Sequence, residues 1–313
     1  MRAWLTLGLW SLVAFLVGVI NQSARGAFPF LPAPETASGT ALGIAYLAVL
    51  LAALLFAARS AARLPHSTPF LLVAGLLFAA PLAFVIGLAR LGGHAPWPLA
   101  LAANNLFLPI AAALAGAGIG RVIRHPNTLI AAAGFGVFFD IVQVTAGTVA
   151  VMLQNNSKFV AAVSVGGGVA AAPSAPGVPP PPPPLSGVTI GPADVLFVAV
   201  FLSGIGLLRL SERATLGWMF ALLLAALAYV EITGAPVPAL APMGLAVILA
   251  NARHARFTRQ EKFALVYGTG FALVLAVLLV AGARGVLGGN GGDTTPRRPS
   301  AVPAPVAPIR ATP

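Results

Sequence analysis

The chain has 313 residues, of which 58% are hydrophobic and 8% are charged, and its mean hydropathy is +0.94. Soluble domains contain about 45–50% apolar and about 25% charged residues, so this composition excludes an ordinary soluble domain and indicates a polytopic membrane protein. The formal net charge is +11, and the lack of cysteine excludes disulfides, thiolate catalysis and cysteine-ligated metal sites.

Nine apolar segments follow one another along the chain, each near the roughly 20 residues that cross a bilayer. The first also permits interpretation as a signal peptide, because Ala24-Arg25-Gly26 places small residues at cleavage-like spacing. Its apolar run of about 18 residues is longer than a usual signal core, which favours a membrane helix. The predicted fold is an all-α polytopic membrane protein of about nine transmembrane helices, at 3–20, 41–58, 69–90, 97–118, 128–150, 189–208, 214–232, 236–250 and 263–283.

Positive charge alternates between the two ends of these segments. The N-terminus and the second, fourth, sixth and eighth connections hold eleven Lys and Arg residues, whereas the first, third, fifth and seventh hold three. The positive-inside rule then places the N-terminus in the cytoplasm, where basic connections meet anionic lipids rather than nucleic acid. This pattern, the residue bias and the lack of cysteine suit a bacterial inner membrane.

Two stretches are predicted to lie outside the membrane. Residues 153–187 contain an unbroken proline run, Pro179 to Pro184, which favours a semi-rigid extended spacer or a ligand for a proline-binding groove. The Pro-rich tail 284–313 is expected to be disordered. These stretches divide the chain into N-terminal helices (1–127), a first Asp-bearing helix (128–152), the loop (153–187), a C-terminal group of helices (188–283) and the tail.

Of the seven acidic residues, Asp140 and Asp194 are the two that lie well inside apolar runs. A charged carboxyl at membrane depth costs on the order of 3 kcal/mol, so such a residue indicates a function. The two carboxyls can meet if one helix tilts or bends, which Gly147 and Pro192 permit.

Two adjacent carboxyls would have the chemistry of an aspartic protease. At about 3 Å apart they cannot both ionise, so they share one proton. One then takes a proton from water while its protonated partner polarises a peptide carbonyl, and no metal or cofactor is expected. Gly191 and Ala193 are small, which lets a substrate backbone approach Asp194. The alternative is that the aspartates carry ions or bond to polar groups such as Asn104, Asn105 and Gln143.

The triplet Pro238-Ala239-Leu240 opens the eighth segment, where proline in a first helical turn leaves backbone groups exposed to an extended peptide. It completes an ordered set with Phe139-Asp140 and Gly191-Pro192-Ala193-Asp194, which are separated by a long loop. This set resembles the Tyr-Asp, Gly-x-Gly-Asp and Pro-Ala-Leu motifs of the presenilin and signal peptide peptidase family of intramembrane aspartyl proteases. The resemblance covers residues 128–250 by motif, and the N-terminal half only by helical pattern.

The resemblance implies a presenilin-like bundle in which Asp140 and Asp194 are the catalytic acid/base pair. Gly191 and Ala193 would border the substrate, and Pro238, Ala239 and Leu240 would position it. The substrates implied are single transmembrane helices or signal-peptide remnants. The chain departs from the family pattern at Phe139, Pro192 and Ala193, and its motifs fall on the fifth, sixth and eighth segments instead of the sixth, seventh and ninth.

The fifth segment runs from inside to outside, which is similar to the signal peptide peptidase branch and implies type II substrates. The alternative functions are those of a prepilin-type peptidase, a proton- or ion-coupled transporter and an inactive protease-like scaffold. Glu231, at the outer end of the seventh segment, is interpreted as an interfacial carboxylate, with a transport path as the alternative. The sequence does not indicate an oligomeric state.

Overall fold

The structure is a computed structural model that describes residues 1–28, 30–91, 97–146, 165, 184–235 and 237–283. These residues are mostly helical, as predicted, and each of the nine predicted segments overlaps a helix in the described part of the chain. The helices are α1 (Arg2–Ala27), α2 (Ala37–Ala62), α3 (Thr68–Leu91), α4 (Trp97–Gly120), α5 (Pro126–Ala146), α8 (Pro192–Leu207), α9 (Glu212–Thr233), α10 (Leu240–Asn251), which continues into the short 3₁₀ helix η1 (Ala252–His254), and α11 (Arg259–Ala283).

Two helices begin later than predicted, and a proline stands at the start of one and shortly before the start of the other. The α8 helix begins at Pro192 rather than 189, and α10 begins at Leu240 rather than 236. A proline fits the first position of a helix, which needs no N–H donor there, but in a helix interior it removes a hydrogen bond. Asp194 therefore lies in the first turn of its helix, and Pro238 lies before α10 rather than in its first turn.

Three of the described helices are long and apolar enough to cross a membrane: Arg2–Asn21 of α1, and all of α2 and α9. Shorter apolar stretches occur at Thr68–Pro81, Asn104–Gly120, Pro126–Phe138 and Pro192–Leu207. The predicted loop 153–187 lies outside the described residues except for residues 165 and 184–187, and so do the predicted tail 284–313, Gly147 and Pro236.

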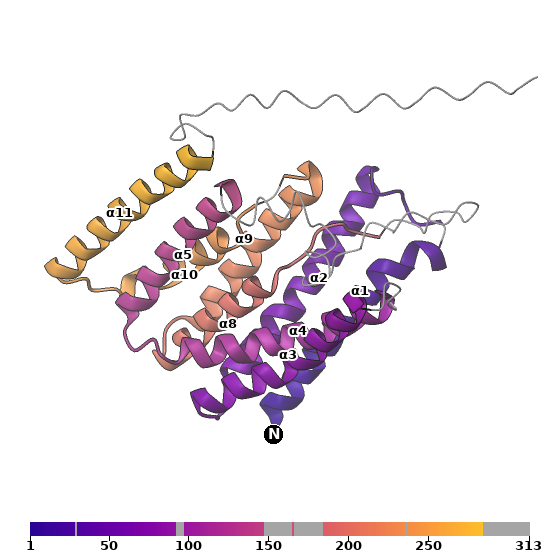
Figure 1. Ribbon diagram of the computed structural model, residues 1–313, viewed down its shortest axis with the longest axis horizontal. Coiled ribbons are helices and arrows are strands. Elements are labelled where there is room, and N and C mark those ends of the chain that lie inside the picture. Colours follow the sequence, from indigo (N-terminus) through magenta and orange to yellow (C-terminus); the bar gives the residue numbers. More distant parts are fainter. Residues whose placement is uncertain (29, 92–96, 147–164, 166–183, 236, 284–313) are drawn as a thin grey trace, which may run out of the picture.

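Helix α2 lies at the centre of the bundle and packs against α1, α4, α8 and α9 (Figure 1). One face of it is buried along its whole length, from Tyr46 through Leu54 to Ala61. A second group joins α10 to α5 and α9, and α11 packs on α5 at the edge of the molecule. The helix that carries Asp140 and the helix that carries Asp194 thus belong to two neighbouring groups, and α10 contacts both.

Small residues bring α4 close to α8. A methyl group placed on Gly116 would overlap the carbonyl oxygen of Leu196, and one on Gly120 would overlap that of Val200. The two glycines are four residues apart, the spacing that lets helices in membranes pack backbone to backbone. The Ser203 hydroxyl of α8 adds a 2.9 Å hydrogen bond to the Ala117 carbonyl. This contact fixes the position of the helix that carries Asp194.

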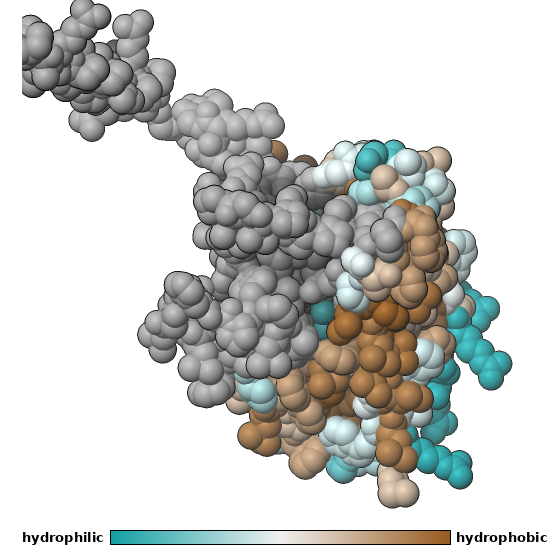
Figure 2. Space-filling model, turned by 90° about the vertical axis from the view of Figure 1, so that its right-hand side faces the viewer, coloured by the Kyte–Doolittle hydropathy of each residue, from teal (hydrophilic) through white to brown (hydrophobic). Residues whose placement is uncertain are grey.

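Large apolar side chains are exposed in stripes along several helices. On α1 they are Leu5, Leu9, Leu12 and Leu16, a spacing of three to four residues that keeps them on one helix face. Figure 2 shows hydrophobic residues gathered across the described part of one side of the molecule, with hydrophilic residues at its edge. Soluble monomers rarely expose a continuous apolar area of this kind, which marks a surface for lipid or protein contact.

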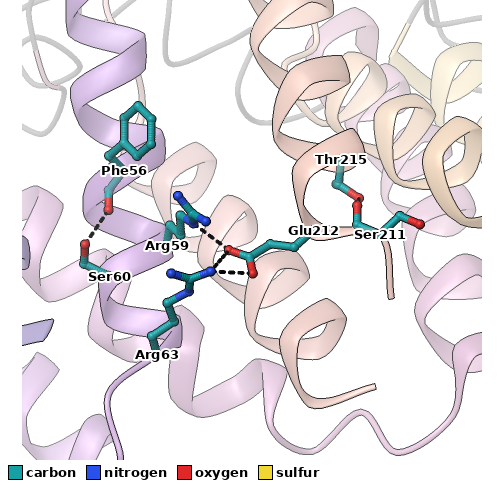
Figure 3. A network of polar contacts seen from close by, with 7 residues as sticks. All are labelled: Phe56, Arg59, Ser60, Arg63, Ser211, Glu212 and Thr215. Carbon is teal, nitrogen blue, oxygen red and sulfur yellow. Dashed lines mark hydrogen bonds and ion pairs between the residues drawn. The ribbon is translucent and has the colours of Figure 1, made fainter. Parts of the chain in front are cut away.

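An ion-pair network ties α2 to the start of α9 (Figure 3). The Glu212 carboxylate accepts a 2.6 Å hydrogen bond from Arg59 Nε and bonds of 2.8 and 2.9 Å from Arg63 Nη2. Arg59 and Glu212 are about three-quarters buried, whereas Arg63 is about half exposed. Two guanidinium groups on one carboxylate leave an excess of positive charge at this end of the bundle.

Candidate active site

Asp140 reaches from α5 to the first residue of α10. Its Oδ2 accepts a 2.6 Å hydrogen bond from the backbone N–H of Leu240. The first N–H groups of a helix have no partner within the helix, so a carboxylate from a neighbouring helix satisfies one of them and is favoured by the helix dipole. Asp140 is half-buried and Leu240 is buried. The Pro-Ala-Leu segment and the first aspartate are therefore in direct contact.

Asp194 is held by the segment that precedes its own helix. Its Oδ2 accepts a 2.9 Å hydrogen bond from the Gly191 N–H, and its own N–H donates 3.2 Å to the Gly191 carbonyl. Pro192 stands at the start of the helix, where its missing N–H costs nothing and its fixed φ suits the helix. The proline that departs from the family motif is thus explained by its place at a helix start.

Asp140 binds the residue that follows Ala239, and Asp194 lines a cavity together with Ala239. A cavity of about 270 Å³ lies between α2, α8, α9 and α10, and both Asp194 and Ala239 line it. The rest of its wall is largely aliphatic, from Leu51 and Leu55 of α2 to Leu223 and Leu227 of α9. A low-dielectric wall around a carboxylate strengthens its electrostatic interactions with a bound group.

The other predicted site residues fall in two places. Gly191 is half-buried beside Asp194, whereas Ala193 is exposed on the first turn of α8. Pro238 and Ala239 are half-buried at the start of α10. The Leu240 N–H donates its hydrogen bond to Asp140. This backbone donor is therefore not free for an extended peptide to pair with, although the sequence predicted exposed backbone groups here.

The amide side chains considered as partners of the aspartates lie elsewhere or are not described. Asn104 and Asn105 are buried in α4, and Asn105 lies against Gly18 of α1, where an added methyl would come within 2.5 Å of its Nδ2. The side chain of Gln143 lies outside the described residues. Both aspartates bond to backbone N–H groups at helix starts. Each therefore serves as a helix cap, and each keeps one oxygen that these bonds do not use.

A polar cluster near the cavity was not predicted as a unit. It joins Asn21 of α1, Ser186 of the segment before α8 and Glu231 of α9. Glu231 is half-buried and accepts a 2.6 Å hydrogen bond from the Ser186 hydroxyl. Nothing in the spacing of these three residues signals that they meet.

No group of three His, Asp or Glu side chains that could bind a metal ion occurs within the described residues. No protein-family model, curated protein or solved structure matches this chain.

Proposed function

We propose that the chain is an intramembrane aspartyl protease, a divergent relative of the presenilin and signal peptide peptidase family. The observation that carries this proposal is the 2.6 Å hydrogen bond from the Leu240 N–H to Asp140, beside the cavity that Asp194 and Ala239 line. It joins the first aspartate to the third motif, and the cavity joins that motif to the second aspartate. The three motifs that carry the resemblance thus meet in one region.

In the proposed reaction, Asp140 and Asp194 share one proton and act on one water molecule. The ionised carboxylate takes a proton from the water, whose oxygen attacks the carbonyl carbon of the scissile peptide bond. The protonated carboxyl donates a hydrogen bond to the carbonyl oxygen and stabilises the charge that develops there. The proton taken from water then passes to the peptide nitrogen as the C–N bond breaks, which restores the pair.

The surroundings of the pair favour an apolar peptide. The cavity walls are mainly leucine and valine, and the residues at Gly191 and Ala239 are small enough for a backbone to approach. We propose that an unwound stretch of a single transmembrane helix or of a signal-peptide remnant enters here. The positive-inside pattern favours a nine-span bundle with a cytoplasmic N-terminus, type II substrates and anionic lipids at the basic connections.

The test is cleavage of single-span reporter helices by the purified protein in liposomes, with product masses to locate the cut. The proposal predicts a cut within the apolar span and inhibition by a hydroxyl-containing mimic of the tetrahedral intermediate. A reporter fused within residues 160–180 tests the orientation and should lie outside. Intact substrates throughout the panel would contradict the proposal.

A proton- or ion-coupled transporter is the second candidate, and the polar cluster of Asn21, Ser186 and Glu231 favours it. Buried polar groups along a membrane path mark ion or proton translocation in transporters. This function predicts ion flux in the same liposomes, lost on substitution of Asp140 or Asp194, without peptide cleavage. An inactive protease-like scaffold predicts neither activity.

A further inference from the structure

The segment that leads to Asp194 is anchored to the first helix. Asn21 of α1 makes three hydrogen bonds with it: its carbonyl accepts 3.0 Å from the Leu185 N–H, its Oδ1 accepts 2.9 Å from the Ser186 N–H, and its Nδ2 donates 3.1 Å to the Ser186 carbonyl. All three residues are buried. Because buried polar groups are costly when unpaired, this set holds residues 185 and 186 in one position.

Ser186 connects this anchor to α9. Its hydroxyl donates 2.6 Å to Glu231 Oε2 and accepts 3.1 Å from the Val188 N–H. Glu231 is thus the acceptor that orients the hydroxyl, and the hydroxyl in turn fixes the backbone two residues further on. Gly43 of α2 provides the space: a methyl group there would come within 2.6 Å of Glu231 Oε1 and 3.0 Å of the Leu185 carbonyl.

The anchored segment continues directly into the candidate active site. Residues 187–190 line the cavity, and Ile190 pairs with Val165 through two backbone hydrogen bonds of 2.8 and 3.0 Å. The next residue, Gly191, donates the N–H that holds Asp194. Only four residues separate Ser186 from Gly191, so a shift at Ser186 changes the position of the Asp194 carboxylate.

We propose that Glu231 is a positioning residue for Asp194, acting through Ser186 and residues 187–191. This role rests on the proposed protease function. The carboxylate of Glu231 touches neither aspartate, but it keeps the segment in the conformation that aims the Gly191 N–H at Asp194. A displacement of about 1 Å at a reacting group is enough to lower a rate by about 100-fold. Loss of Glu231 should therefore slow turnover more than it weakens substrate binding.

The test compares Glu231→Gln with Glu231→Leu. The glutamine oxygen still accepts the Ser186 hydroxyl, whereas leucine removes the acceptor. We expect kcat to fall at least 10-fold in the leucine variant with KM within threefold of the wild type, and both constants to stay within threefold in the glutamine variant. Equal losses in the two variants, or no loss in the leucine variant, would overturn the proposal.

A second readout does not depend on cleavage. The chain has no native cysteine, so a Thr189→Cys substitution on the cavity wall gives a single thiol for labelling by a membrane-impermeant maleimide. Glu231→Leu should raise the labelling rate at least fivefold, and Glu231→Gln should leave it unchanged. If no reporter is cleaved but labelling changes as expected, the protease function fails while the anchoring by Glu231 stands.

Two further substitutions keep the test decisive if Glu231→Leu does not fold. Gly43→Ala pushes a methyl group against Glu231 Oε1, and Ser186→Ala removes the hydroxyl between Glu231 and Val188. Both should raise the Thr189→Cys labelling rate, whereas Ser186→Thr, which keeps the hydroxyl, should not. Unchanged labelling in both Gly43→Ala and Ser186→Ala would overturn the proposal.

Discussion

The carboxylate of Asp140 binds the backbone N–H of Leu240 at 2.6 Å, across 100 positions of sequence. The contact links the fifth predicted segment to the triplet that opens the eighth. It also gives the aspartate a structural role as a cap for α10, a short helix of 12 residues. The proposed catalysis and the capping would use different properties of the same side chain, so substitutions can separate them.

Asp140→Ala should destabilise the protein by about 1 kcal/mol, the usual cost of losing a side-chain helix cap. Asp140→Asn should stay close to the wild type in stability, because its amide oxygen can still accept the Leu240 N–H. Thermal unfolding in detergent, followed by the fluorescence of the four tryptophans, measures both. Equal stabilities for the two variants would show that the hydrogen bond does not hold α10.

Gly116→Ala and Gly217→Ala make the same chemical change, but we expect them to change the free energy of unfolding in opposite directions. At Gly116 the new methyl overlaps the Leu196 carbonyl of α8, and such overpacking typically costs about 1–3 kcal/mol. At Gly217 the position is open, and alanine in place of glycine within a helix stabilises by about 0.5–1 kcal/mol. Unfolding curves of the two variants, recorded under one condition, give the change in the free energy of unfolding for each. A stabilising Gly116→Ala would contradict the packing of α4 on α8.

Glu212→Gln removes the charge that Arg59 and Arg63 share between α2 and α9. We expect a loss of roughly 1 kcal/mol in the free energy of unfolding at low salt, because the network is partly exposed. The loss should shrink at high salt, which screens the interaction. Glu35→Gln, at an exposed position, is the matched control and should have little effect. A loss at Glu212 that salt does not change would argue against the ion pairs.

Acidification should loosen the start of α11. The pKa of Glu261 lies below its ordinary value of 4.5, mainly because the Thr258 N–H donates to its carboxylate at 2.7 Å, with further bonds from the Asn127 amide. A lowered native pKa stabilises the folded form above the ordinary value, and this stabilisation is lost as the pH falls through the native pKa. The protection of the first-turn amides of α11, measured as their hydrogen exchange relative to the intrinsic rate at each pH, should therefore fall below about pH 4.5.

The Glu261→Gln variant has no carboxyl at position 261 that could bind or release a proton. Its exchange should depend on pH only through the intrinsic chemistry of amide exchange. If the wild type and this variant showed the same change on acidification, the titration of Glu261 would not be the cause.

The helices were predictable because each is a long apolar run, from 41–58 within α2 to 214–232 within α9. The starts of α8 and α10 were harder to predict, because the apolar pattern begins before the prolines at 192 and 238 and continues across them. Both prolines stand outside the helix interior. Both aspartates were singled out because a carboxyl is conspicuous in an apolar run.

Their partners could not be read from the sequence, because both bond to backbone N–H groups, which every residue type except proline supplies. The cluster of Asn21, Ser186 and Glu231 was not predicted from the sequence for a different reason. Asn21 and Ser186 are 165 positions apart, and Ser186 and Glu231 are 45 apart. Their contact depends on how α1, α2 and α9 pack around the segment before α8. Sequence spacing alone carries no information about such tertiary contacts.

Isosteric substitution tests whether Asp140 and Asp194 form one catalytic pair. Asp140→Asn and Asp194→Asn keep an oxygen for the Leu240 and Gly191 N–H groups, so both should fold, yet neither can exchange a proton at neutral pH. The measurement is the initial rate of cleavage of a single-span reporter helix in liposomes. If the two aspartates act as a pair, each variant loses at least 100-fold in rate while its unfolding temperature stays near that of the wild type. Cleavage at the wild-type rate in either folded variant would contradict the pairing.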